Sequence, residues 1–199
     1  MNGALLRTAE VNRKTKETAI TIRLNLDGSG IFKGSTGIGF FDHMLNLLTV
    51  HSSMDMSLDM KGDLEVDNHH SLEDLGLVLG EAVREALGDK KGIARYGTFF
   101  CPMDETLVRC VLDFSGRPYL VYDVPLTVER IGTFETEMLR EFLQAFAVAA
   151  GCNLHVACLY GTNNHHKVEA VFKAMAHAMK EAFTVDLTRP GILSSKGVL

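Results

Sequence analysis

One eight-residue stretch occurs twice in the chain and constrains its fold more than any other feature. The first copy spans residues 67–74 and reads DNHHSLED, and the second spans residues 163–170 and reads NNHHKVEA. Each copy places two adjacent histidines and a glutamate at the start of a predicted helix. Because successive helical residues point about 100° apart, the two histidines of one copy cannot easily bind the same ion. The repeat therefore predicts two metal sites shared between two halves of one fold.

A single copy of this motif is weak evidence for a metal, since histidine pairs are also common at helix starts as capping or surface groups. Repetition strengthens the case, because all three ligand types recur at the same spacing. An apolar helical pattern of similar length also follows each copy. We therefore interpret both copies as metal-binding segments.

Aligning the two halves extends the ligand set beyond the motif. With His69 set on His165 and a gap of two residues allowed further upstream, His43 falls opposite Glu141. Both side chains can bind a metal, and each precedes an apolar helical stripe. The repeat thus predicts eight ligands, four to each site, namely His43, His69, His70, Glu73, Glu141, His165, His166 and Glu169.

The predicted ligands are nitrogen and carboxylate donors without sulfur. This set suits Mn²⁺, Fe²⁺, Zn²⁺ or Ni²⁺, and the sequence does not choose among them. Four protein ligands on a six-coordinate ion leave two positions open, which is typical of a catalytic site. The glutamate follows both histidines, unlike the metalloprotease motifs. A di-iron carboxylate bundle is an alternative, but it requires an all-α chain, and strand patterns are present here.

Composition limits the class of protein. The chain has 199 residues, is 46% hydrophobic and carries a net charge of −5, so it can bury one sizeable core and does not favour nucleic acid or a membrane surface. No run of eighteen apolar residues is present, and the first residues lack a signal-peptide pattern. We therefore expect a cytoplasmic protein whose cysteines are reduced core thiols.

The pattern of residues predicts a duplicated α/β unit. In chain order the first half predicts a strand, a helix, two strands and a helix, at residues 17–26, 40–48, 54–58, 64–66 and 71–87. The second half predicts a strand and its partner strand, a helix, a strand and a helix, at residues 107–114, 119–124, 135–150, 153–160 and 167–183. Ser71 is expected to be the N-cap of its helix.

We expect one fused domain rather than two separate ones. The connector near residues 88–92 is polar but too short to separate independent domains. The expected halves are residues 1–91 and 92–187, followed by a tail at residues 188–199.

Several basic residues point to an anionic ligand. Arg95, Arg117, Lys173 and the tail segment 194–197 supply guanidinium, ammonium and backbone N–H groups near predicted turns and ends. Such groups bind phosphate. Each of them taken singly is more typical of a solvated surface residue.

Together these segments resemble the imidazoleglycerol-phosphate dehydratase family. The resemblance lies in the sequence FFDHML at residues 40–45 and in the two histidine-containing copies, and it extends over residues 16–197. It implies a metal-dependent hydro-lyase of histidine biosynthesis, in a stand-alone form, that converts imidazole glycerol phosphate to imidazole acetol phosphate. It also implies a duplicated fold similar to ribosomal protein S5 domain 2, with a four-stranded sheet in each half.

The resemblance also implies how the ligands divide between two Mn²⁺ ions. One ion would take His43, His70, His165 and Glu169, and the other would take His69, Glu73, Glu141 and His166. At the position of Glu141 many relatives carry histidine and others glutamate, so the carboxylate of this chain bears on metal preference at that site.

Further residues match substrate-contacting positions of the family. The implied substrate-binding residues are Glu17, His51, Arg95, Arg117, Lys173, Ser195, Lys196 and Gly197, with the basic groups and Ser195 on the phosphate. The resemblance also implies that the tail at residues 188–199 covers the substrate. We expect the two ions to stabilise a substrate imidazolate, which expels the adjacent hydroxyl to give a diazafulvene-like intermediate. Glu17 is the candidate proton shuttle and Asp104 a second candidate, while Glu73 and Glu169 take part as metal ligands.

The family resemblance implies a homo-oligomer in which trimers assemble into a 24-mer, with active sites built between subunits. Two other classes remain as alternatives. One is a different di-metal enzyme acting on a phosphorylated small molecule, such as a hydrolase or an oxygenase. The other is a metal-storage shell without catalysis, which would bind many ions per chain and no specific substrate.

Overall fold

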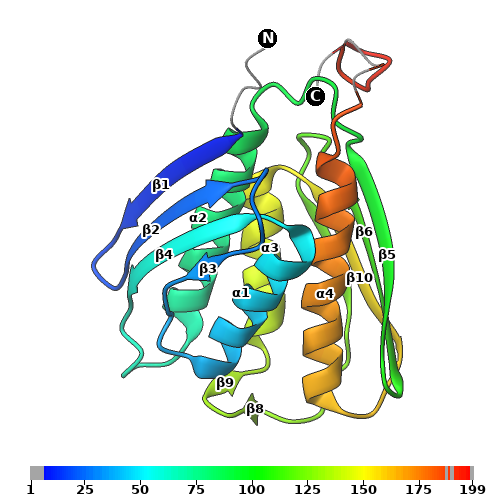
Figure 1. The fold of residues 1–199 in the computed structure, drawn as a ribbon. Coiled ribbons are helices and arrows are strands. Elements are labelled where there is room, and N and C mark those ends of the chain that lie inside the picture. Colours follow the sequence, from blue (N-terminus) through cyan, green and yellow to red (C-terminus); the bar gives the residue numbers. More distant parts are fainter. Residues whose placement is uncertain (1–6, 187, 189–190, 198–199) are drawn as a thin grey trace.

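The computed structural model describes residues 7–186, 188 and 191–197. Its first half contains four strands and two helices (Figure 1), which in chain order are β1 (Thr8–Lys14), β2 (Ala19–Asn25), β3 (Phe32–Lys33), α1 (Gly39–Ser52), β4 (Asp55–Lys61) and α2 (His69–Leu87). The described residues of the second half add β5 (Tyr96–Met103), β6 (Thr106–Asp113), β7 (Tyr119–Asp123), β8 (Arg130–Ile131), β9 (Phe134–Glu135), α3 (Met138–Ala150), β10 (Asn153–Tyr160) and α4 (Asn164–Phe183).

The two halves share one topology. The first sheet has the strand order β1-β2-β4-β3, and the second has the matching order β5-β6-β10-β7. The last pair in each sheet, β3 with β4 and β7 with β10, is parallel, and the other pairs are antiparallel. The short β8–β9 hairpin lies in neither sheet. The predicted duplicated fold, with a four-stranded sheet in each half, is confirmed.

The helices form a layer between the two sheets (Figure 1). Helix α2 packs on β1 and β2, whereas α4 packs on β5 and β6. Across the layer α2 contacts α3, and α1 contacts α4. All four described helices begin at the lower end of the molecule in Figure 1, so the predicted ligands in or near their first turns gather at that end.

A single hydrophobic core joins the two halves. Phe41 of α1 has its ring centroid 5.6 Å from that of Phe134, 5.0 Å from that of Phe142 and 5.5 Å from that of Phe172. All four phenylalanines are fully buried. Apolar side chains from both sheets continue the same core.

The β8–β9 hairpin fixes the start of α2. The Asn68 amide donates to Glu135 Oε2 at 3.1 Å, and the Glu135 amide donates to Asn68 Oδ1 at 3.2 Å. Phe134 of the same hairpin packs between α1 and the core. The hairpin therefore ties together helix starts that carry predicted ligands.

Several predicted elements need correction. Residues 64–66 form a turn rather than a strand, because the Val66 amide donates to the Asp63 carbonyl at 2.8 Å and closes the chain on itself. The strand expected at residues 119–124 exists as β7, but it pairs with β10 rather than with β6. Strand β6 already pairs with β5 on one side and with β10 on the other, so no edge of β6 is left for β7. The helix expected at residues 135–150 begins at Met138, since Phe134 and Glu135 belong to β9.

Ser71 is not an N-cap. Helix α2 begins at His69, so Ser71 lies inside its first turn with its hydroxyl buried and without a hydrogen-bond partner in the part of the chain that the structure describes. Glu17 lies in the turn between β1 and β2 rather than in a strand. The expected limits at residues 1, 187 and 199, and part of the tail 188–199, fall outside the described residues.

Candidate active site

Three of the predicted ligands meet between α1 and α4. The Nε2 atoms of His43 and His165 lie 3.5 Å and 3.2 Å from the same Oε2 atom of Glu169. Candidate ligand atoms of these three side chains all lie within 4.8 Å of one another. Two imidazoles and one carboxylate facing a common point are a suitable donor set for Mn²⁺ or a similar ion.

Glu169 is the most enclosed member of this group. Its side chain is only 9% exposed, and its second oxygen, Oε1, lies 2.6 Å from Lys173 Nζ, one helical turn further along α4. Burial raises the pKa of Glu169, but Lys173, His165 and His43 together lower it below its usual value. The carboxylate is therefore ionised at neutral pH and available to a cation.

His166 lies beside the β5–β6 turn. Its Nδ1 atom is 2.8 Å from Glu105 Oε2, and its Nε2 atom is 3.8 Å from Asp104 Oδ2. Asp104 has a left-handed backbone with φ of 47° at the tip of this hairpin, and its side chain is 81% exposed. The hydrogen bond that the Glu105 carboxylate accepts from the ring raises the pKa of His166.

His69 and His70 occupy the start of α2. The His69 Nε2 atom lies 3.5 Å from Glu73 Oε2 on the same helix, and the His70 Nδ1 atom lies 2.9 Å from Asp63 Oδ2. The hydrogen bond that the Asp63 carboxylate accepts from the ring raises the pKa of His70. The negative charge of Glu17, in the β1–β2 turn, contributes a smaller part of the same upward shift in the pKa of His70.

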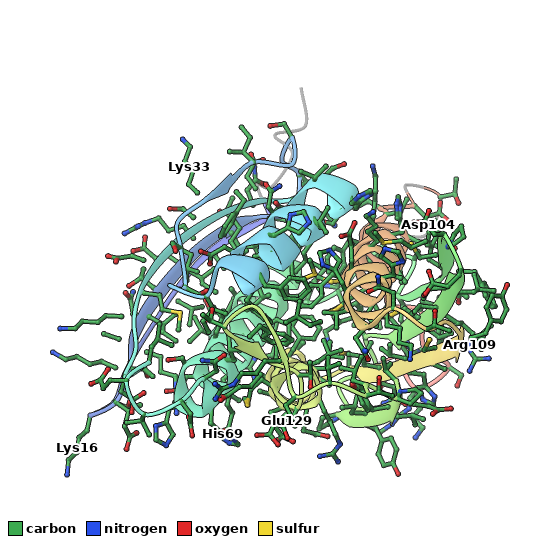
Figure 2. All side chains as sticks on the ribbon, turned by 90° about the horizontal axis from the view of Figure 1, so that it is seen from below. Lys16, Lys33, His69, Asp104, Arg109 and Glu129 are labelled. Atoms are coloured by element: carbon green, nitrogen blue, oxygen red, sulfur yellow. The ribbon has the colours of Figure 1, made fainter. Side chains whose placement is uncertain are left out.

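Neither predicted four-ligand set comes together within one chain. In the described residues, His43, His165 and Glu169 form the only group of three or more such side chains with ligand atoms within 4.8 Å of one another. His70 does not join them, and Glu141 of α3 pairs with Arg140 at 3.1 Å. Figure 2 views the end where the helices begin and shows His69 well separated from Asp104.

Four predicted substrate-contacting residues line one pocket away from these ligands. Arg95, Arg117, Ser195 and Lys196 surround a cavity of about 400 Å³ together with Ser115, Gly116 and Ser194. The Arg95 amide donates to the Ala182 carbonyl at 2.9 Å, so the cavity lies near the C-terminal end of α4, whereas the ligands lie at or near the helix starts. Gly197 comes next along the tail, with its amide donating to the Ser194 carbonyl at 3.1 Å.

Arg95 is already engaged within the chain. Its Nε and Nη2 atoms donate to Asp113 at 2.6 Å and 3.0 Å, and its Nη1 atom donates to the Leu193 carbonyl at 2.6 Å. The Asp113 hydrogen bonds raise the pKa of Arg95. The guanidinium thus holds the tail against the second sheet in addition to any contact it makes with an anion.

Lys173 and His51 do not line that pocket. Lys173 faces Glu169, and the Nδ1 atom of His51 lies 3.2 Å from Nε2 of His177. The His177 ring stacks on Phe99 with centroids 4.2 Å apart. Burial is the main cause that lowers the pKa of both histidines.

Sequence reasoning missed several side chains that touch predicted site residues, among them Asp63, Glu105 and His177. Asp63 precedes His70 by only seven residues, so its proximity could have been considered from the spacing. Glu105 and His177 reach their partners across sheets and helices, and no local pattern marks them. Asn163 is a further case, because its side chain accepts the amides of His165 and His166 and caps α4.

Comparison with known proteins gives a consistent result over the whole chain. The profile of the imidazoleglycerol-phosphate dehydratase family matches residues 36–179. A protein of that name from Caldanaerobacter subterraneus is 56% identical over 194 residues, covering 98% of this chain and all of the relative. Another, from Acetivibrio thermocellus, is 54% identical over 193 residues, covering 97% of this chain and 99% of the relative.

Solved structures agree with the fold. The crystal structure of imidazoleglycerol-phosphate dehydratase from Staphylococcus aureus is 39% identical, has a TM-score of 0.81 and covers 89% of this chain and 99% of that one. The enzyme from Pyrococcus furiosus, in complex with (S)-C348, is 33% identical with a TM-score of 0.80 and covers 95% of this chain and all of that one. No helix in the described residues is both long and apolar enough to cross a membrane.

Proposed function

The chain belongs to the imidazoleglycerol-phosphate dehydratase family, and from that premise we propose how its residues bind and transform the substrate. It is a hydro-lyase of histidine biosynthesis that removes water from imidazole glycerol phosphate and yields imidazole acetol phosphate. A biosynthetic role supports a cytoplasmic location, which we include in the proposal.

We propose that two Mn²⁺ ions serve each active site. The first ion would be held by His43, His70, His165 and Glu169, and the second by His69, Glu73, Glu141 and His166. The observation that carries this proposal is the convergence of His43, His165 and Glu169 on one point. When bound, the ions would supply Lewis acidity to the imidazole ring of the substrate.

The proton transfer is assigned to the chain's own carboxylates. The reaction breaks a C–O bond next to the ring and a C–H bond on the neighbouring carbon, and the enol that remains becomes the ketone. Glu17 is the proposed proton shuttle, because it is exposed in a turn and acts electrostatically on His70. Asp104, exposed beside His166, is the second candidate.

The substrate phosphate is proposed to bind to the basic side chains. Arg95, Arg117, Ser195 and Lys196 already share a pocket, which supports a common ligand. Lys173, His51 and Gly197 complete the proposed set. Because Lys173 Nζ lies 2.6 Å from Oε1 of the proposed metal ligand Glu169, its ammonium group would lie beside the ions.

We also propose that each active site forms between copies of the chain, within trimers that assemble into a 24-mer. The separation of His70 from His43, His165 and Glu169 supports this, because a second copy would be needed to complete that ligand set. The second sheet supports it as well, since among the described residues it alone of the two four-stranded sheets exposes large apolar side chains, namely Tyr96, Phe100, Tyr119, Val121, Leu159 and Tyr160.

The direct test is turnover of imidazole glycerol phosphate by chelator-stripped protein with and without added Mn²⁺. We expect imidazole acetol phosphate to form only after metal is restored. Absence of turnover in protein that has rebound two ions per chain would overturn the proposed role of the ions.

Glu17→Gln provides a separate test of the proton shuttle. The variant should bind Mn²⁺ normally and lose about 10²–10⁴-fold in turnover, the usual contribution of a general acid or base. Glu10→Gln is the matched control, because Glu10 pairs with Arg23 on the first sheet and contacts no predicted ligand. Unchanged turnover in Glu17→Gln would remove Glu17 from the mechanism.

A further inference from the structure

Two carboxylates outside the predicted ligand set hold the second histidine of each repeated pair. We infer that Asp63 and Glu105 are positioning residues, which orient His70 and His166 so that the Nε2 atom of each ring is presented to a metal ion. The inference rests on the proposed function, since His70 and His166 are proposed ligands. Beyond the proposed ligand set, the inference specifies the tautomer of the His70 and His166 rings and the side chain that fixes each tautomer.

Asp63 acts on His70. It follows β4 in the chain, and its Oδ2 atom lies 2.9 Å from His70 Nδ1. The Asp63 side chain is 16% exposed, and its Oδ1 atom is buried with no hydrogen-bond partner in the described residues. An ionised carboxylate only accepts hydrogen bonds, so the proton of a neutral His70 ring must be on Nδ1. The lone pair is then on Nε2, which is free to bind a metal.

Glu105 acts on His166 and also fixes the start of α4. Its Oε2 atom lies 2.8 Å from His166 Nδ1, while its Oε1 atom accepts the amides of Thr162 at 2.9 Å and Asn163 at 2.7 Å. The Glu105 carboxylate therefore fixes both the orientation of the His166 ring and the backbone at the start of its helix. The same argument as for His70 leaves the lone pair of His166 on Nε2, which faces Asp104 across 3.8 Å.

The two halves reach this arrangement by different routes. Asp63 lies just upstream of its own histidine pair, whereas Glu105 comes from the hairpin between β5 and β6. In contrast, the first histidine of each pair directs Nε2 to a glutamate on its own helix, His69 to Glu73 at 3.5 Å and His165 to Glu169 at 3.2 Å.

This division of partners recurs in both copies although the residues that produce it are not equivalent in the repeat. If these ion pairs served only the fold, there would be no reason for the same pattern to occur in both copies. Metal binding explains it, because a metal-bound imidazole usually has a carboxylate on Nδ1 and presents Nε2 to the ion.

The test measures metal affinity in the absence of substrate. Free Mn²⁺ is followed by electron paramagnetic resonance during titration of the full-length, chelator-stripped protein. Asp63→Asn and Glu105→Gln should each weaken Mn²⁺ binding by about 10–100-fold, the usual effect of losing such a partner. Because His70 and His166 serve different ions, each variant should weaken one binding step and leave the other unchanged.

Matched variants separate positioning from folding. Asp59→Asn on β4 and Glu129→Gln before the β8–β9 hairpin change exposed carboxylates that contact no predicted ligand, and both should bind as the parent does. In a His70→Ala background, Asp63→Asn should have no further effect on affinity, and the same should hold for Glu105→Gln in a His166→Ala background.

Parent-like affinity in both single variants would overturn the inference. The inference would also be overturned if the carboxylate substitution weakened Mn²⁺ binding as much in the His70→Ala or His166→Ala background as in the parent. That result would show that the carboxylate acts only on the fold. If the parent protein itself bound no Mn²⁺, the proposed function would fail instead, so the two failures are distinguishable.

Discussion

At the scale of single residues, proton binding and metal binding compete at the second histidine of each pair. Asp63 raises the pKa of His70 and Glu105 raises the pKa of His166. A raised pKa in the folded state means that protonation stabilises the metal-free fold below the unfolded value near 6.5. That contribution is lost as the pH rises through the folded-state pKa.

Metal binding should therefore show the opposite dependence on pH. A histidine must lose its proton to bind an ion, so Mn²⁺ affinity should fall as the pH drops through the raised pKa values of His70 and His166. Calorimetric titration in two buffers with different ionisation enthalpies should detect proton release near pH 7. Release that is absent at this pH, or that increases toward alkaline pH, would contradict the argument.

At the scale of helices and strands, two glycines set how closely the halves approach. A Cβ added to Gly76 of α2 would lie 2.6 Å from the Phe142 carbonyl oxygen, and one added to Gly80 would lie 2.6 Å from that of Phe146. The obstructing atoms belong to the backbone of α3, so they cannot move aside as a flexible side chain could. The α2–α3 contact thus depends on residues without a side chain.

Substitution of these glycines should destabilise the fold. Gly76→Ala and Gly80→Ala should each cost about 1–3 kcal/mol, the usual penalty for overpacking, as measured by denaturant unfolding. Gly39→Ala is the matched control, because a Cβ at that position meets nothing within 4 Å. It should leave stability unchanged or slightly higher. Equal stability of all three variants would contradict this prediction, because it would show that α2 and α3 accommodate an added Cβ without cost.

Local patterns explain which elements the sequence predicts. The sequence predicts strand β10 with its observed limits and β2 closely, because polar and apolar residues alternate along β2 and along the first half of β10. Strand β1 was missed, since Val11 is its only buried residue. Strand β5 was missed because it contains Pro102 and an apolar run without alternation, which an edge strand tolerates.

The residues of the candidate site also differ in whether a local sequence pattern marks them. The repeat itself predicts eight ligands, since identical spacing on equivalent helices is a property of sequence. Asp63 and Glu105 could not be found in that way, because they are not equivalent in the repeat and meet their histidines only through the folded chain. The partner of β7 is a similar case, because pairing depends on topology rather than on a local pattern.

At the scale of the whole molecule, the central claim is that the metal sites are completed by a second copy. The four helix starts lie at one end of the molecule, yet His70 does not meet His43, His165 and Glu169. Symmetric assembly would solve this by bringing the α2 start of one copy to the α1–α4 group of another.

Mixing two inactive variants tests this claim most directly. His70→Ala and His165→Ala should each lose turnover, because each removes a proposed ligand of the same ion. After dissociation with chelator, mixing in equal amounts and reassembly with Mn²⁺, about one quarter of the shared sites should combine an intact His70 from one chain with an intact His165 from another. The account predicts that turnover returns to about that fraction of the parent value. Mixtures that reassemble, yet remain as inactive as the separate variants, would contradict it.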